Sequence, residues 1–301
     1  MYEKFYNLNR APFSLLPDPE FLLPTRRHAM ALTLLQYSLV AQHSFIVMTG
    51  EVGSGKTTLI NKLLDEIGER HTVGLMNFTD CRMTQIWPWI LDALDVPRKS
   101  KDKAQMQHEF NSFLRETRRQ GRSTVLIVDE AQNLAPKALE HLRMLSNANN
   151  SEMLVQTILV GQPEFLETLK RPDLRQLNQR IGVFYRLEPL TELETGAYIA
   201  HRLQCAGGSP QTFSAESVAW IWAESGGIPR RINTLCEFAL VYGCTSGKTI
   251  IDSEVVREML EDRHNYAVPT NKSRQIGSGL VAAARFAGSN SQYDLRTWKA
   301  S

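Results

Sequence analysis

The sequence of 301 residues is poor in cysteine, in long apolar runs and in excess charge of either sign. Its four cysteines form no CxxC pair, which argues against a disulfide framework and against a zinc site. No run approaches the roughly 18 apolar residues of a membrane-spanning helix, and the first ten residues lack the apolar core of a signal peptide. We therefore expect a cytoplasmic protein. A net charge of +2 gives no general argument for nucleic acid, although it allows local basic patches.

The sequence from residue 28 to 189 alternates between short apolar segments and segments of helical period. This alternation predicts an α/β fold with a parallel sheet that is covered by helices on both faces. The expected strands are 44–49, 73–77, 124–128, 155–160 and 182–187, and the expected helices are 28–40, 56–68, 84–94, 103–120 and 137–147.

The pattern changes after Pro189, where four helices are expected at 191–203, 214–225, 229–242 and 252–263. Thr191 and Glu194 have the spacing of a capping box at the start of the first one. Four prolines among the first 24 residues exclude a long helix, so we expect an extended arm that packs on the next domain. The predicted organisation is an arm at 1–24, an α/β domain at 25–189, a small helical lid domain at 190–264 and a mostly disordered tail at 265–301.

The loop after the first strand matches the phosphate-binding pattern GxxxxGK[ST] at every defined position. Its glycines allow backbone N–H groups to turn towards phosphates, and the start of the next helix adds positive potential. Lys56 is expected to reach the β- and γ-phosphates, and the Thr57 hydroxyl is expected to bind Mg²⁺. The predicted nucleoside triphosphate site comprises Gly50, Glu51, Val52, Gly53, Ser54, Gly55, Lys56, Thr57 and Thr58.

Two acidic residues, Asp129 and Glu130, end the uniformly apolar strand 124–128. Asp129 is expected to hold the magnesium ion directly or through water, and Glu130 is expected to act as general base on the attacking water. Carboxylates at a buried strand end are costly without a cation, and a bound metal gives that cost a reason. The alternative is an ordinary solvated strand end.

Three more polar residues are candidates for contacts with the nucleotide. Gln162 ends a strand beside the acidic pair and is a candidate sensor of the γ-phosphate; the alternative is a turn residue. Arg180 precedes the last strand and is expected to reach the γ-phosphate of a neighbouring subunit, with Arg175 as the competing candidate. Arg230, after Pro229 at a helix start, is expected to contact the phosphates of its own chain.

As a set, these residues resemble the AAA+ ATPases, and more narrowly the general secretion pathway protein A family. The resemblance implies ATP rather than GTP, with Mg²⁺. It implies ATP binding by Lys56 and Thr57, catalysis by Asp129 and Glu130, and roles for Arg180 and Arg230 as arginine finger and phosphate sensor. The expected catalytic set is therefore Lys56, Glu130, Arg180 and Gln162. The resemblance also implies a homo-oligomer, ring-like or ATP-dependent, whose sites are shared between subunits. It extends over residues 1–262 and includes Phe5-Tyr6-x-Leu8, Pro12-Phe13, Pro17-Asp18-Pro19-x-Phe21-Leu22, Thr49 to Thr58, Val128 to Leu134, Leu142 to Asn147, Gly161 to Glu164 and Gly227 to Asn233.

Residues Leu142 to Asn147 look most like the soluble subgroup that is encoded at exopolysaccharide and exosortase loci. The implied protein is a cytoplasmic ATPase, peripheral to the inner membrane, that powers or regulates assembly of an envelope export system. Its expected partners are inner-membrane export or polysaccharide-assembly proteins. A DNA-associated regulator of transposition, or a nucleotide-gated scaffold with little turnover, is the alternative. Phosphate contacts to DNA would come from Arg115, Arg118, Arg119 and Arg122, which otherwise form a solvated helix face.

Overall fold

Five parallel strands form a single sheet in the computed structural model, which describes residues 2–15, 21, 23, 25–78, 85–149 and 152–266. Their spatial order is β2-β3-β4-β1-β5, and every neighbouring pair is parallel. The predicted fold class is therefore confirmed. The strands are β1 (Phe45–Gly50), β2 (His71–Asn77), β3 (Ser123–Asp129), β4 (Val155–Gly161) and β5 (Ile181–Leu187).

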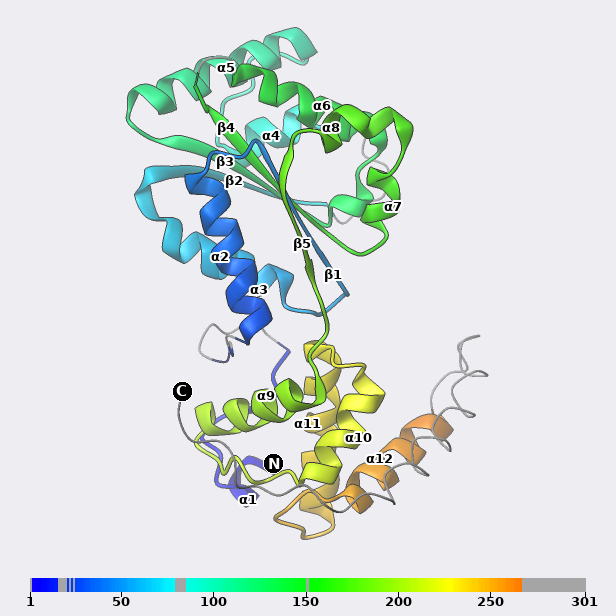
Figure 1. The fold of residues 1–301 in the computed structure, drawn as a ribbon. Helices are drawn as coiled ribbons and strands as arrows, with labels where there is room; N and C mark the ends of the chain where they lie inside the picture. Colours follow the sequence, from blue (N-terminus) through cyan, green and yellow to red (C-terminus); the bar gives the residue numbers. More distant parts are fainter. Residues whose placement is uncertain are drawn as a thin grey trace, which may run out of the picture. The chain divides into compact units, whose positions relative to one another are not determined.

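The three central strands, β3, β4 and β1, are buried on both faces of the sheet. Successive residues of a strand point to opposite sides, so each strand contributes to both faces. In β3, Leu126 and Val128 belong to one hydrophobic cluster, whereas Val125 and Ile127 belong to another. Helices on the two sides of the sheet, together with the other strands, contribute to the two clusters (Figure 1). The first cluster involves α4 (Trp87–Ala93), α5 (Lys103–Arg119), α6 (Pro136–Leu145), α7 (Phe165–Leu169) and α8 (Arg175–Asn178), and the second involves α2 (Arg26–Val40) and α3 (Lys56–Ile67).

Helix α2 begins at Arg26, two residues before the start that periodicity predicts. Thr25 explains the difference, because its hydroxyl accepts a hydrogen bond from the backbone N–H of His28 at 3.4 Å and so caps the helix. The predicted helix 84–94 begins at Trp87 in α4, and position 84 lies outside the described residues.

Helices α9 (Glu192–Cys205), α10 (Ala215–Ser225), α11 (Pro229–Thr245) and α12 (Ser253–Tyr266) follow the sheet. The capping box between Thr191 and Glu194 is present. Residues 1–257 form one compact unit and residues 258–301 a second. The predicted tail lies outside the described residues from position 267 onward. Within the described ranges, no helix is both long enough and apolar enough to cross a bilayer.

Described residues of the N-terminal segment contact the helices α9 and α11 and the turn after α11. The Tyr2 hydroxyl donates to the Glu237 carboxylate at 2.7 and 2.8 Å, and the Tyr6 hydroxyl donates to the Lys248 carbonyl at 2.9 Å. Burial raises the pKa of Tyr6 to about 12, so this hydroxyl remains a donor. At Tyr2 and Tyr6 the arm thus packs on the helical part of the chain. The segment also contains a short helix, α1 (Tyr2–Phe5).

Gln156 is a buried polar residue in the otherwise apolar strand β4, and it ties the sheet to the end of α2. It is 1% exposed, and its amide nitrogen donates to the carbonyls of Ser38 and His43, each at 3.1 Å. The Ser38 carbonyl has a second donor, the backbone N–H of His43. Among these bonds, the His43 carbonyl has Gln156 as its single donor. This contact fixes the loop from which β1 runs to the phosphate-binding residues.

Substitution of Gln156→Leu is expected to destabilise the protein by about 2 kcal/mol, because the partly buried His43 carbonyl loses its donor. Urea unfolding monitored by circular dichroism would show this loss as a midpoint lowered by about 1 M. Gln176→Leu is the matched control, because Gln176 is exposed on α8. Equal midpoints for the two variants would contradict the assigned role of Gln156.

Candidate functional site

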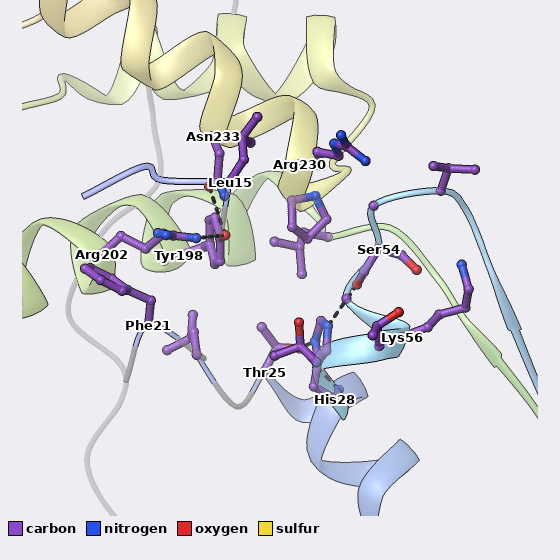
Figure 2. A pocket seen from close by; sticks show the side chains of 18 of the residues that line it. Leu15, Phe21, Thr25, His28, Ser54, Lys56, Tyr198, Arg202, Arg230 and Asn233 are labelled. Atoms are coloured by element: carbon purple, nitrogen blue, oxygen red, sulfur yellow. Dashed lines mark hydrogen bonds between the residues drawn. The ribbon is translucent and has the colours of Figure 1, made fainter. Parts of the chain in front are cut away.

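A cavity of about 350 Å³ lies between the phosphate-binding loop and α9 and α11, within the compact unit 1–257 (Figure 2). Its walls come from four parts of the chain that are far apart in sequence. The loop and α3 supply Val52, Gly53, Ser54, Gly55, Lys56, Thr57 and Thr58; the sheet edge supplies Glu130; the helical part supplies Leu190, Tyr198, Arg202, Pro229, Arg230 and Asn233; and the N-terminal part supplies Ser14, Leu15, Phe21, Leu23, Thr25 and His28.

The loop itself has the backbone that phosphate binding requires. Gly53 and Gly55 have φ angles of 80° and 98°, and α3 starts immediately afterwards at Lys56. The Lys56 ammonium donates to the carbonyls of Gly50 at 2.8 Å and Glu51 at 2.9 Å. Gly50 and Glu51 therefore hold the lysine and do not themselves line the cavity.

Lys56 is a buried cation, 6% exposed, and forms no ion pair within the described part of the chain. Burial lowers the pKa of Lys56, and the nearby carboxylates of Glu130 and Asp129 oppose that shift. A buried ammonium bonded only to carbonyl oxygens favours an incoming anion, because that anion supplies the missing countercharge. The N-terminus of α3 adds to the same positive potential.

Thr57 and Asp129 bring two oxygen ligands together beside the loop. The Thr57 hydroxyl donates to Asp129 Oδ2 at 3.0 Å, and Asp129 Oδ1 accepts the Glu130 N–H at 2.9 Å. Asp129 is buried at the end of β3. A hydroxyl and a carboxylate in contact are hard oxygen ligands of the kind that Mg²⁺ prefers, so these residues fit the predicted ion.

Glu130 is oriented by two glutamine side chains. Its backbone is left-handed, with φ of 55°, and its carboxylate accepts a hydrogen bond from Gln162 Nε2 at 3.0 Å and another from the Gln132 amide. Gln132 Oε1 in turn accepts the backbone N–H of Gln162 at 3.0 Å. The structure thus places Gln162 beside Glu130, and it adds Gln132, which the sequence analysis did not single out.

Arg230 is the second residue of α11 and lies where this helix touches the loop. Its backbone N–H donates to the Gly53 carbonyl at 3.2 Å, and a Cβ on Gly53 would lie 2.5 Å from the Arg230 Cβ. Pro229 occupies the first helical turn, as predicted. The Arg230 side chain is exposed and lines the cavity (Figure 2).

His28 supports the loop from the side of α2. Its Nε2 lies 3.2 Å from the Ser54 carbonyl, and its Nδ1 lies 2.7 Å from the Thr25 hydroxyl. Burial lowers the pKa of His28, which favours the neutral imidazole. A neutral ring with Nε2 as donor satisfies both contacts and leaves the positive charge at Lys56.

Arg180 has its contacts at the end of α6 in its own chain. Its Nη1 donates to the Arg143 carbonyl at 3.4 Å and also contacts the Ser146 hydroxyl. Arg175 is exposed, and no hydrogen bond or ion pair joins its side chain to the described residues. Neither arginine lines the cavity of its own chain.

Two of the four arginines on α5 and the turn after it have carboxylate partners within the chain. Arg118 bonds to Glu152 at 3.1 Å and Arg119 lies 3.5 Å from Glu116, whereas Arg122 donates to the neutral Gln120 at 2.5 Å. The two ion pairs offset part of the positive charge that a phosphate backbone would meet. They do not favour the DNA-binding alternative.

Several residues of the site were not predicted from the sequence motifs. Gln132 has a local signal, because it lies two residues after Glu130 and next to the same strand end. Tyr198 and Arg202 have none, since they line the cavity only through the packing of remote segments.

Comparison with known proteins agrees with this geometry. A family model described as an AAA domain matches residues 40–169. General secretion pathway protein A of Aeromonas hydrophila is 36% identical over 249 residues, which are 82% of this chain and 46% of that protein. The chain thus spans less than half the length of this relative.

Solved structures of low sequence identity share the fold. Cdc6p from Pyrobaculum aerophilum superposes with a TM-score of 0.62 at 18% identity, covering 83% of this chain and 70% of that one. The ORC1 protein of Aeropyrum pernix, solved in complex with DNA, gives a TM-score of 0.59 at 19% identity, covering 84% and 69%. At such identity the likeness concerns the fold alone. The parallel sheet, the matched AAA domain and the long alignment with the secretion protein show that the chain belongs to the AAA+ ATPases of the general secretion pathway protein A family.

Proposed function

We propose that this chain binds ATP with Mg²⁺ in the cavity and hydrolyses it. The observation that carries the proposal is the buried Lys56, which has no ion pair in the described part of the chain and lies beside the contact of Thr57 with Asp129. Lys56 and the N-terminus of α3 would bind the β- and γ-phosphates. Thr57 and Asp129 would hold the magnesium ion, which neutralises phosphate charge when bound. Family membership supports ATP as the nucleotide.

The proposed chemistry at Glu130 is activation of water. Its carboxylate lines the cavity, and the amides of Gln132 and Gln162 orient it through one oxygen, Oε2. The other carboxylate oxygen is available to accept a proton from water that attacks the γ-phosphate. Gln162 contacts both Glu130 and Gln132. It would therefore couple the position of the Glu130 carboxylate to the end of β4.

The Glu130→Gln variant is expected to bind ATP with nearly unchanged affinity and to lose at least about 10² in turnover, because an amide cannot accept the proton. Affinity would be measured with a fluorescent ATP analogue and turnover by phosphate release. Glu167→Gln is the control, because its carboxylate is exposed in a pair with Lys170. Turnover equal to that of the parent protein would remove Glu130 from the proposed role.

Hydrolysis is further proposed to require a second copy of the chain. In this proposal Arg180 stabilises transition-state charge in the neighbouring site, which would require it to leave the end of α6. Arg175 is the competing candidate, because its exposed side chain makes no such contact with the described residues.

The Arg180→Ala and Arg175→Ala variants separate these candidates. The variant that removes the arginine acting in the neighbouring site is expected to bind ATP normally and to lose about 10³ in turnover. Specific activity of the parent protein should rise with protein concentration, and the damaged variant should recover activity when mixed with Glu130→Gln, since one mixed interface then carries both intact groups. Full activity of both variants in a confirmed oligomer would show that neither arginine acts in the neighbouring site.

We also propose that ATP turnover powers or regulates assembly of an envelope export system for secretion or exopolysaccharide. Support comes from the alignment with general secretion pathway protein A over most of this chain. The partners would be inner-membrane export or polysaccharide-assembly proteins.

This proposal predicts that the protein sediments with inner-membrane vesicles carrying the cognate export proteins when ATP is present. Vesicles without those proteins and the Lys56→Ala variant are the controls. If the protein does not sediment with the vesicles and instead lowers the gel mobility of duplex DNA in the presence of ATP, the transposition alternative would be favoured. That DNA shift would weaken steeply with added salt.

A further inference from the structure

Arg202 on α9 is a second buried cation of the cavity. It is 6% exposed and forms no ion pair within the described residues. Its three nitrogen groups donate to three different neutral oxygens: Nε to the Pro12 carbonyl at 2.5 Å, Nη1 to the Tyr198 hydroxyl at 2.8 Å and Nη2 to the Ser14 carbonyl at 3.2 Å. Burying a charge without a countercharge is costly, so the fork of hydrogen bonds is the main compensation.

The same guanidinium also holds the ring of Phe21. Its Cζ lies 4.6 Å from the ring centroid, and the Cζ of Arg10 lies 4.4 Å from the same centroid. Phe21 is 5% exposed. Residues 12, 14 and 21 are therefore held at one point by one side chain.

We define the strap as the described N-terminal residues 2–15, 21 and 23. Four of its residues, Ser14, Leu15, Phe21 and Leu23, line the cavity, as does Arg202. Figure 2 shows Phe21 and Arg202 on one side of the cavity, and Ser54 and Lys56 on the other. With the triphosphate held at Lys56, the nucleoside must extend towards the strap.

Tyr198 connects this anchor to the helix that carries Arg230. The Tyr198 hydroxyl accepts from Arg202 and donates to Asn233 Oδ1 at 2.9 Å. Asn233 lies one turn after Arg230 on α11. A continuous set of hydrogen bonds thus runs from the strap carbonyls through α9 to the helix that touches the phosphate-binding loop.

We infer that the strap is the wall of the nucleoside end of the cavity and that Arg202 is the positioning residue that holds it there. The inference rests on the proposed nucleotide binding. Nucleotide and strap then stabilise each other, because binding one favours the arrangement that binds the other. Arg202 acts through the shape of its hydrogen-bond fork, whereas Lys56 acts by charge on the phosphates.

The test compares Arg202→Lys, Phe21→Leu and the double variant with the parent protein. Lysine keeps the positive charge but has one nitrogen, which cannot replace three donors directed at three acceptors. Arg257→Gln is the control, because Arg257 is an exposed arginine of α12. Two quantities are measured: amide hydrogen exchange of peptides from residues 2–15, and nucleotide binding with a fluorescent ATP analogue together with steady-state turnover.

In the nucleotide-free protein, Arg202→Lys should speed exchange in the strap peptides while peptides from β1 and β3 keep their protection. The dissociation constant and KM for ATP should each rise about tenfold, which corresponds to about 1.4 kcal/mol, with kcat little changed. Phe21→Leu should act in the same direction, and the double variant should be no worse than Arg202→Lys alone, because both changes release one element. ATP should slow strap exchange in the parent protein.

Unchanged strap exchange in Arg202→Lys would overturn the inference, as would parent-like affinity in that variant, since charge alone would then suffice. A fall in kcat at constant KM would also overturn it. If the parent protein bound no nucleotide, the proposed function would fail, whereas the exchange data on the nucleotide-free protein would still decide whether Arg202 anchors the strap.

Discussion

The close approach of Arg230 to Gly53 is the contact on which the shared cavity depends. The Gly53 carbonyl accepts the first free N–H of α11, and a Cβ at Gly53 would lie 2.5 Å from the Arg230 Cβ. Only glycine therefore satisfies this position, both for its φ of 80° and for the space around it. Through this contact the loop that is built to hold phosphates also fixes where a helix outside the sheet begins. A change in the loop on nucleotide binding would thereby be transmitted to α11 at Arg230, its second residue.

A second constraint concerns the orientation of Glu130. A left-handed backbone at a residue other than glycine costs roughly 1–3 kcal/mol and persists only where its surroundings impose it. Here the surroundings are the Asp129 side chain, which accepts the Glu130 N–H, and the amides of Gln132 and Gln162. Because β3 and β4 are parallel neighbours, the residues that follow them meet at one sheet edge. The alignment of these strands thus determines where the carboxylate points.

The parts that sequence reasoning predicted are those with local signals. The apolar run before Asp129, the spacing of Gly50, Gly55 and Lys56, and the helix start at Pro229 each report a constraint that acts within about ten residues. These signals were enough for the parallel sheet and for the proximity of Thr57 to Asp129. The packing of the strap on α9 and α11 was not predictable in this way. Its bonds, such as that between Arg202 and the Pro12 carbonyl, join residues that are about 190 positions apart and end on backbone atoms, which carry no residue-type signal.

The two arginines of the helical part illustrate a division between charge and shape. Arg230 is exposed, so its guanidinium keeps its hydration and can move towards an anion at little cost. Arg202 is buried and fully engaged by neutral oxygens, so moving it would leave a desolvated cation without partners. The first arrangement suits a group that responds to the phosphates, and the second suits a fixed anchor. Tyr198 and Asn233 link Arg202 to the helix that carries Arg230. A movement of Arg230 towards the phosphates would therefore take place while Arg202 keeps the nucleoside end of the cavity fixed.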